Sequence, residues 1–495
     1  MNNSQIFLAL FGCGPHAQRV YLPALKRLSA EFGVELSLVV DLYSKADTVQ
    51  NALAKLGLRP ETWFIQPFQG ALPCTLATRL SSFVSRKVIT GIVIATEPLA
   101  HKAYAEWALQ QGLSILLDKP ITTRENVTSD LSAADGIEQD YIELLRLYEN
   151  AQTKRPTAFI VNAQRRFHPG FQLAEDLISE IGLKTNCPVT FVHSYHCDGQ
   201  WRLPSEFVTQ EYHPYRQGYG KASHSGYHIF DAATRLYLAA GTTEKFADRM
   251  EIVSSFIQPA GFLRQINETD YRNLLGPNYK DVSSWTDSEL YGIMAKYGEI
   301  DLAVNVRLIQ GMDAIANVSI NLVHNGFSRR SWMRPGADLY KGNGRVKHEH
   351  HNIQQGPFQN IQIHSYQAKD SHDRGGPEEE RLGGNNHFEL HVFRNPLVTD
   401  NSQSLQVYRL SDIEARGKDE DGNSLIIERV KHKVVREFVE FLLGRRLIDS
   451  MRSRFEDHLV TVLLMSGVYR SHILRSISKN PIVNKDIPLT KWSKK

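Results

Sequence analysis

Two different hydrophobic patterns divide the chain near residue 155. Before this point, short apolar runs alternate with amphipathic stretches, as expected for parallel strands buried on both faces and separated by helices. The apolar runs are Ile6–Phe11, Leu36–Val40, Val88–Ala95 and Leu113–Leu117. This order predicts an α/β Rossmann domain over residues 1–155.

The pattern changes after Pro156, where strand candidates follow one another with one long amphipathic helix, His168–Ile181, among them. The strand candidates are Thr157–Asn162, Val189–Tyr195, Glu251–Phe256, Ile300–Leu308, Ala314–Val323, Ile361–His364 and Phe388–Phe393. This succession predicts an α+β domain with a large, mostly antiparallel open sheet over residues 156–495. We expect insertions to enlarge it around 256–395, and helices within 434–476 to close it.

Composition describes an ordinary globular protein. The 495 residues are 42% hydrophobic and 22% charged, and the formal net charge is +3. This balance gives no reason to expect a nucleic acid as partner, and no apolar run is long enough to cross a membrane. The four cysteines contain no CxxC pair, and no secretory signal is visible before the first strand. A reducing, cytoplasmic location is therefore expected.

A glycine-rich turn follows the first apolar run directly. Its residues are Gly12, Cys13, Gly14, Pro15, His16 and Ala17. The order matches the dinucleotide-binding fingerprint, in which the first Gly permits a tight turn and the second lets the backbone approach a pyrophosphate. All six residues are expected at the cofactor, with Cys13 as a small turn residue. The alternative is a Rossmann-like domain that binds no nucleotide.

Asp41 ends the second apolar run. An acid at this position can bind both hydroxyls of an adenosine ribose, and it would repel a 2′-phosphate. The sequence therefore favours NAD over NADP as cofactor. Ser44 and Lys45 follow closely and could help to hold a phosphate, which keeps NADP as the second choice.

A lysine follows another predicted strand, in Asp118-Lys119-Pro120. Ligands of open α/β sheets bind outside the carboxyl ends of the strands, so Lys119 is expected where cofactor and substrate meet. A lysine can act there as an acid or a base, because desolvation readily lowers its pKa.

These segments resemble the Gfo/Idh/MocA oxidoreductase family. Asp118-Lys119-Pro120 is similar to its Glu-Lys-Pro signature, and Thr96 to His101 is similar to its Thr-x-x-x-x-His loop. Gln164 to Pro169 and Tyr469-Arg470-Ser471 are similar to two further family segments. The resemblance implies that Thr96, His101 and Lys119 contact the cofactor. It also implies a homo-oligomer, a dimer or a tetramer, paired through the open face of the second sheet.

A second motif of the family, Asp-x-Gly-x-His-x-x-Asp, is matched by residues 224–231, with His224 in place of the first acid. The resemblance implies that His228 transfers the substrate proton beside His224, and that Tyr227 and Asp231 line the substrate site. Helical spacing places His224, His228 and Asp231 on one face. Such a set could also ligate a metal or merely form a polar surface; we expect no metal.

Two further clusters have open roles. Arg165 and Arg166 can bind a substrate phosphate or carboxylate, or pair with an acid inside the protein. His348-Glu349-His350-His351 lies in a stretch rich in Gly, Asn and Lys, and we expect a solvated loop there rather than a metal site. The wider stretch Leu339–Gln359 and the stretch Asp370–Asn386 are both expected to be long loops or hairpin tips.

The resemblance implies hydride transfer between a nicotinamide cofactor and a secondary alcohol of a sugar, cyclitol or nucleotide-linked sugar. Lys119, His228 and His224 would carry the catalysis, and a small molecule would be the partner. Two rivals remain. One is a glycosidase or epimerase of the same family that recycles NAD within one turnover, and the other is a non-catalytic, NAD-binding regulatory protein.

Overall fold

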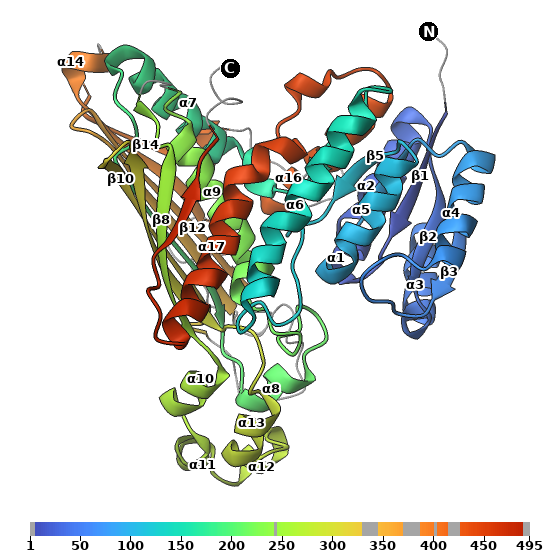
Figure 1. Ribbon diagram of the computed structural model, residues 1–495, viewed down its shortest axis with the longest axis horizontal. Coiled ribbons are helices and arrows are strands. Elements are labelled where there is room, and N and C mark those ends of the chain that lie inside the picture. The colour runs from blue at the N-terminus through green and yellow to red at the C-terminus, as the bar shows by residue number, and fades with distance from the viewer. Residues whose placement is uncertain are drawn as a thin grey trace. The chain divides into compact units, whose positions relative to one another are not determined.

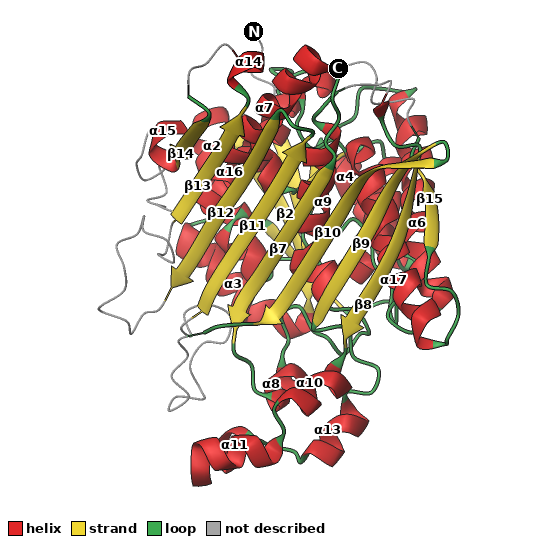
Figure 2. Cartoon of the chain, turned by 90° about the vertical axis from the view of Figure 1, so that its left-hand side faces the viewer, coloured by secondary structure: helices red, strands yellow, loops and turns green. Residues whose placement is uncertain are grey.

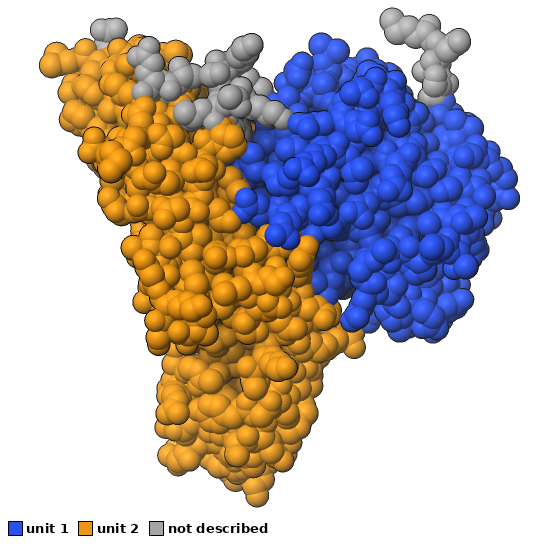
Figure 3. Space-filling view, viewed as in Figure 1, with its two compact units in different colours: residues 1–123, 137–168, 417–462 blue, residues 124–136, 169–416, 463–495 orange. Residues whose placement is uncertain are grey.

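The computed structural model describes residues 5–241, 245–328, 345–369, 387–399, 403–413 and 426–488, so the predicted loop at Asp370–Asn386 lies outside the described residues. The chain forms two compact units (Figure 3). Unit 1 comprises Met1–Thr123, Ile137–His168 and Gly417–Val462, and unit 2 comprises Arg124–Gly136, Pro169–Arg416 and Leu463–Lys495. Three segments therefore fall outside a simple division near residue 155: Arg124–Gly136, residues 156–168 and Gly417–Val462. The strand expected at Thr157–Asn162 in the second domain belongs instead to the parallel sheet of unit 1.

Unit 1 is built on a sheet of six strands, all parallel to their neighbours. In spatial order they are β3 (Glu61–Ile65), β2 (Val34–Leu42), β1 (Ile6–Phe11), β4 (Gly91–Ile94), β5 (Ser114–Leu117) and β6 (Phe159–Val161). The side chains of β4 and β5 are buried throughout, which explains the unbroken apolar runs of the sequence. This arrangement confirms the predicted Rossmann topology.

The helices of unit 1 come from both ends of the chain (Figure 1). They are α1 (Pro15–Arg19), α2 (Tyr21–Phe32), α3 (Ala46–Leu56), α4 (Cys74–Lys87), α5 (His101–Gln110), most of α6 (Leu131–Gln152) and α16 (Ile426–Leu442). Helix α16 packs on α2, where Arg436 Nη1 donates a hydrogen bond of 2.8 Å to Glu31. One of the helices expected within 434–476 to close the second domain therefore belongs to the helical layer of unit 1.

Unit 2 is built on a sheet of nine strands (Figure 2). In spatial order they are β14 (Leu405–Arg409), β13 (His387–Arg394), β12 (Gln359–Lys369), β11 (Arg345–Gln355), β7 (Phe191–Gln200), β10 (Asp313–Asn325), β9 (Asp301–Gln310), β8 (Arg249–Ile257) and β15 (Val483–Asp486). Among the strands that the structure describes, only β7 and β10 pair in parallel, and every other neighbouring pair is antiparallel. The predicted α+β domain with a mostly antiparallel sheet is confirmed.

Helices lie against one face of this sheet. They are α7 (Pro169–Thr185), α9 (Tyr227–Leu238) and α17 (Leu459–Ser476). The helix-facing residues of β9 and β10 are mostly apolar and alternate with polar residues of the other face, as in a half-solvated antiparallel sheet. Among the described elements, no helix lies over that other face (Figure 2). Within the same ranges, no helix has the length and apolar content needed to cross a membrane.

A group of short helices lies at one end of the nine-stranded sheet (Figure 1). They are α8 (Pro204–Thr209), α10 (Pro259–Gln265), α11 (Glu268–Leu275), α12 (Tyr279–Val282) and α13 (Asp287–Ile293). Phe207, Tyr215, Phe262 and Leu290 form the centre of their shared core. This group accounts for part of the enlargement expected around 256–395. Two further short helices, α14 (Pro396–Thr399) and α15 (Leu410–Ile413), flank β14.

The prediction of a solvated loop at His348-Glu349-His350-His351 is wrong, because these residues form the middle of β11. Glu349 and His351 face the helices and are buried. Ser194 Oγ lies 2.8 Å from His351 Nδ1, and His351 Nε2 lies 2.8 Å from Glu349 Oε1. The strand is polar on both faces, so it lacks the alternation of apolar and polar residues that identifies a half-buried strand.

Candidate functional site

Unit 1 gathers most of its predicted site residues at one edge of its sheet. Gly12 follows β1, Asp41 is the last residue but one of β2, Thr96 follows β4, and Lys119 follows β5. The carboxyl ends of parallel strands meet at one edge, where ligands of open α/β sheets bind. The structure therefore brings these four residues to the same edge.

The glycine turn has the geometry that its sequence predicts. Gly12 has φ of 84°, and a Cβ there would lie 2.6 Å from the backbone of Ala95, so only glycine fits. A Cβ on Gly14 would meet nothing within 4 Å, so the backbone here faces open space. Helix α1 begins at Pro15 and continues into α2 after the single residue Val20. The turn thus offers backbone that a ligand can approach closely.

Asp41 holds this turn in place. Its two carboxylate oxygens accept hydrogen bonds of 2.7 Å from the backbone N–H groups of Cys13 and Leu42. Each oxygen keeps further acceptor capacity, which a ribose hydroxyl can use. Burial, with a smaller effect of Asp41, raises the pKa of the Cys13 thiol to about 12. The Cys13 thiol therefore stays protonated, and the contact of this residue with Asp41 is made by its backbone N–H.

His101 is completely buried between two of the turns. Its Nδ1 lies 2.8 Å from the carbonyl oxygen of Pro120, and its Nε2 lies 3.1 Å from that of Thr96. Burial lowers the pKa of His101, although both carbonyls favour its charged form. The structure places His101 as a link between the Thr96 loop and the Lys119 turn, where it sets the position of both.

Asp118 places a negative charge beside Lys119. Burial would raise the pKa of Asp118, but His16, Lys119 and His101 hold it below its ordinary value. His16 lies 3.8 Å from this carboxylate, and its own pKa falls to about 4, mainly through burial. The backbone N–H of Lys119 donates to Asp118 at 3.0 Å, and the lysine is half-buried. The lysine is thus fixed at the sheet edge next to a carboxylate.

Arg165 and Arg166 lie in a short 3-10 turn at Gln164–Phe167, and both are buried. Arg166 donates to the carbonyl oxygen of Asp457 at 3.1 Å, and its guanidinium lies 4.0 Å from the Asp457 carboxylate. Arg166 therefore pairs with an acid inside unit 1, which is one of the two roles left open by the sequence.

The histidine motif lies in unit 2. A π-helical turn at Ala222–Gly226 precedes α9, so regular α-helical spacing does not extend back to His224. His224 is buried, with its ring centroid 5.0 Å from that of Tyr215. His228 is half-buried, whereas Tyr227 and Asp231 are buried within α9. Such π turns occur often at functional sites.

Two carboxylates hold the π turn. Glu299 Oε1 accepts from the backbone N–H of Ala222 at 2.6 Å. Asp198 Oδ2 accepts from Lys221 Nζ at 2.5 Å and from Ser225 Oγ at 3.2 Å. The loop that carries His224 is therefore fixed from both sides.

Sequence reasoning missed Lys221, which is completely buried. Its Nζ lies 3.0 Å from His196 Nδ1 as well as contacting Asp198. Burial lowers the pKa of Lys221 although Asp198 opposes this; burial also lowers the pKa of His196 well below its usual range. Neutral His196 accepts from the ammonium. The sequence feature that could have indicated a buried lysine is its position between two small residues, Gly220 and Ala222.

Glu299 predicts a pH-dependent stability. Burial raises its pKa to about 7, above its ordinary value of 4.5. The folded state then binds a proton that the unfolded state releases, so the free energy of unfolding falls as pH rises from 4.5 to 7. Between pH 5.5 and 8.0 this loss is about 2 kcal/mol. We expect the Glu299→Gln variant to lack this contribution. Urea unfolding at a series of pH values should show its free energy of unfolding falling less steeply with pH than that of the unmutated chain.

The control for this test is Asp313→Asn, at an exposed position of β10. It should leave the slope unchanged. Asp301, whose pKa burial raises to about 6, should retain a smaller slope of the same sign in both variants. A Glu299→Gln slope equal to that of the unmutated chain would contradict the assignment.

No sequence-family model matches this chain, and no curated protein sequence does. Solved structures match nearly its whole length. The WlbA dehydrogenase from Chromobactrium violaceum, solved with NADH and UDP-GlcNAcA, is 13% identical with a TM-score of 0.56, over 99% of this chain and 98% of that one. Levoglucosan dehydrogenase, solved with NADH and levoglucosan, is 13% identical with a TM-score of 0.55, over 98% and 100%. KijD10, a 3-ketoreductase from Actinomadura kijaniata solved with NADP and TDP-benzene, is 12% identical with a TM-score of 0.51, over 94% and 97%.

At these identities the likeness concerns the fold. The chain has the two-domain fold of NAD-binding oxidoreductases of the Gfo/Idh/MocA type, which confirms the fold that the resemblance implied.

Proposed function

We propose that this chain is an oxidoreductase that transfers a hydride between NAD(H) and a secondary alcohol of a sugar, a cyclitol or a nucleotide-linked sugar. The observation that carries the proposal is the sheet edge of unit 1, where the glycine turn, Asp41 and Lys119 come together. The structural neighbours solved with nicotinamide cofactors and sugar ligands support the substrate class.

The residues of this edge fit a dinucleotide. The open space over Gly14 leaves room for a pyrophosphate against the backbone of the turn. Asp41 would accept from the adenosine ribose hydroxyls while still holding the N–H of Cys13. Thr96 and Lys119 would lie at the nicotinamide end. NAD(H) supplies or accepts the hydride when it is bound.

The protein's own groups would orient the alcohol and handle its proton. Lys119 would polarise the substrate oxygen, and Asp118 would keep a negative charge beside the ammonium. His228 would accept the proton as the alcohol is oxidised and return it in the reverse direction. Asp198 and Glu299 would act through the π turn around His224, because Glu299 accepts from the backbone N–H of Ala222 and Asp198 accepts from the hydroxyl of Ser225.

Cofactor choice gives a direct prediction. Asp41→Ala should weaken NADH binding about tenfold or more and narrow its advantage over NADPH, because it removes the ribose acceptor and the anchor of the glycine turn. Calorimetric titration with both nucleotides measures this. Asp47→Ala, at an exposed position of α3, is the matched control and should bind as the unmutated chain does. Tighter binding of NADPH by the unmutated chain would contradict the proposal.

The activity itself is tested with a panel of polyols, aldoses, cyclitols and nucleotide-linked sugars, by following NADH absorbance in the presence of NAD⁺. Reduction of NAD⁺ by at least one of these substrates is the expected result. A nucleotide that stays bound and turns over without net reduction would favour the NAD-recycling glycosidase or epimerase. Tight NAD binding without any turnover would favour a non-catalytic NAD-binding protein.

A further inference from the structure

Three cationic side chains lie close together inside unit 2, on the helix-facing side of the nine-stranded sheet. They are Arg202, Lys221 and Arg345, and we call them the cation cluster. Asp198 on β7 accepts hydrogen bonds of 2.5 Å from Lys221 Nζ and 3.1 Å from Arg345 Nη2. Burial lowers the pKa of Arg202, Asp198 opposes this and Arg345 adds to it, so Arg202 lies within range of both charges. Asp198 thus pairs with two of the three cations.

Arg202 is the member of the cation cluster with an unused buried donor. It is 7% exposed, and its Nε donates at 2.7 Å to the side-chain oxygen of Gln200, which is uncharged. Its Nη1 is buried and has no hydrogen-bond partner among the residues that the structure describes. The nearby acid Glu206 already accepts from the backbone N–H of Leu203 at 2.8 Å. Burying a charge without a paired counter-charge costs much free energy, so Arg202 favours a bound anion.

His196 supplies a second unused donor next to Lys221. Burial lowers the pKa of His196 well below its usual range, so the ring is neutral. Its Nδ1 lies 3.0 Å from Lys221 Nζ and accepts from the ammonium. The ring proton is then on Nε2, which is buried and has no partner within the described ranges. Native proteins leave few buried polar atoms unused, so Arg202 Nη1 and His196 Nε2 are two donors for ligand oxygens.

The cation cluster adjoins the turn that carries the histidine motif. Ser225 Oγ, in the π turn, donates to Asp198 at 3.2 Å. His324 Nδ1 lies 3.3 Å from the same carboxylate and 3.0 Å from the Tyr215 hydroxyl, and the ring of Tyr215 lies 5.0 Å from that of His224. These contacts connect the cluster to the residues that the proposed function assigns to the substrate.

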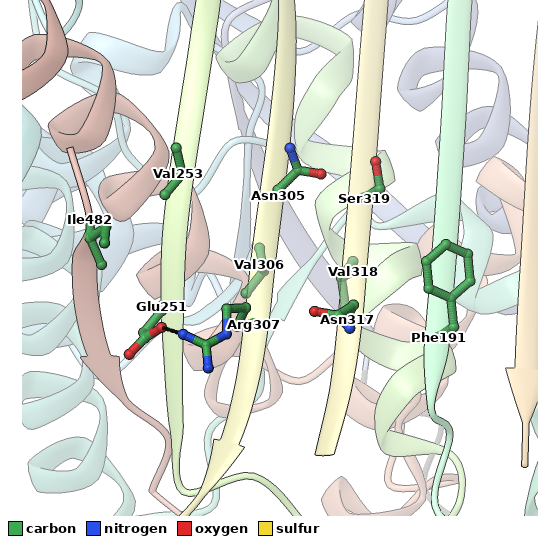
Figure 4. Close-up of a pocket in the computed structure, with 10 residues that line it drawn as sticks. All are labelled: Phe191, Glu251, Val253, Asn305, Val306, Arg307, Asn317, Val318, Ser319 and Ile482. Atoms are coloured by element: carbon green, nitrogen blue, oxygen red, sulfur yellow. Dashed lines mark hydrogen bonds and ion pairs between the residues drawn. The ribbon is translucent and has the colours of Figure 1, made fainter. Parts of the chain in front are cut away.

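Charge is compensated in the hollow on the other face of the sheet. This hollow of about 430 Å³ lies over β8, β9 and β10 (Figure 4). Arg307 is the one cation among the residues that line it, and it donates to Glu251 at 2.6 Å. Its other polar lining residues, Asn305, Asn317 and Ser319, are uncharged. An anionic ligand is therefore favoured at the cation cluster rather than in this hollow.

We propose that the cation cluster binds an anionic group of the substrate, a carboxylate or a phosphate, and that the substrate is an acidic derivative of a sugar or cyclitol. Arg202 and His196 donate to the anionic oxygens, and Lys221 and Arg345 add positive charge beside them. Charge-assisted hydrogen bonds of this kind are roughly twice as strong as neutral ones. A neutral sugar leaves the Arg202 donor unpaired, so the site discriminates against it. The proposal rests on the proposed function, because it concerns the same substrate.

Calorimetric titration of the full chain, with and without NADH, tests this proposal. Each set of probes contains a neutral parent and its acidic derivatives: glucose with glucuronate, a glucose phosphate and UDP-glucose, and the galactose, mannose and inositol counterparts. At least one acidic derivative should bind about tenfold or more tightly than its parent, which is roughly what one hydrogen bond to a charged group contributes. Tightest binding of a uronate assigns the site to a carboxylate, and tightest binding of a phosphorylated member assigns it to a phosphate.

Substitutions in the cation cluster connect this preference to its residues. Arg202→Gln should weaken binding of the preferred acidic derivative about tenfold or more and leave binding of the neutral parent unchanged. Arg345→Gln, at a residue whose side chain is 24% exposed, should lower the same preference and serves if Arg202→Gln does not fold. Arg216→Gln is the matched control, because Arg216 is exposed and follows Tyr215 directly. It should keep the full preference.

Equal binding of the acidic and neutral members of every set would overturn the proposal. It would also be overturned by a chain that binds no member of the panel, or by Arg202→Gln and Arg345→Gln variants that keep the full preference. Failure of the proposed activity gives a different result, because titration without NADH measures binding alone. Preferential binding of acidic derivatives without turnover would count against hydride transfer and support the anionic site. Turnover of neutral sugars without any preference would have the opposite meaning.

Discussion

Lys119→Met is expected to lower kcat by roughly a hundredfold or more, the usual contribution of a positioned acid or base. NADH affinity and thermal stability should change little. Lys119 follows β5 at the edge that carries the glycine turn, and it is half-buried rather than part of the core. Steady-state kinetics on the substrate identified by the panel, with NADH titration and a melting curve, measure the three quantities.

Lys87→Met is the matched control, because Lys87 is an exposed lysine at the end of α4. It should keep normal turnover. Near-normal kcat in Lys119→Met would remove this lysine from the chemistry. A large fall in melting temperature would instead assign it a structural role next to Asp118.

His228→Asn is expected to lower kcat about as strongly, because an amide cannot accept the substrate proton as an imidazole can. The ring is half-buried, so the melting temperature should change little. His224→Asn provides the comparison. His224 is buried with its ring within 5.4 Å of Tyr219 and 4.7 Å of His213, so its replacement should cost stability.

The two histidine variants together distinguish chemistry from packing. If His228 transfers the proton, His228→Asn loses kcat and keeps its stability. If His224 serves mainly to pack the ring cluster, His224→Asn loses more stability than kcat. Equal losses of stability in both variants would contradict proton transfer by His228.

Unit 1 was predictable because its local signals and its fold agree. Buried parallel strands require unbroken apolar runs, and the turn at Gly12 requires a residue that tolerates φ of 84° and leaves no Cβ. Each of these two requirements restricts the residue types that can occupy the position. The sequence alone therefore indicates the buried strands and the glycine turn. Asp41 lies near the carboxyl end of β2 and Lys119 lies just after β5, so the predicted strands also predict the positions of these two residues.

The surroundings of the histidine motif in unit 2 were less predictable, because their contacts join segments distant in sequence. The buried ammonium of Lys221 is held by Asp198 and His196. Both of these residues lie on β7 and come next to Lys221 only once the sheet has formed. The π turn at Ala222–Gly226 depends on Glu299 in the same way. Spacing along one helix could not reveal either feature.

Strand β11 could not be predicted for a different reason. Its polar residues face both sides of the sheet, so no apolar alternation marks it as a strand. His351 and Glu349 can be buried because Ser194 on the adjacent strand completes their hydrogen bonds. A pattern of hydrophobicity contains no information about such pairing.

Transfer of deuterium from NADH that carries deuterium at both hydrogen positions of nicotinamide C4 tests the central claim most directly. After incubation of the full chain with the keto form of its substrate, mass spectrometry of the sugar or cyclitol product should show one deuterium on the carbon that bears the new hydroxyl. The same incubation with Lys119→Met should give little labelled product. Product formed without deuterium, or no product from any member of the panel while NADH is bound, would contradict direct hydride transfer by this chain.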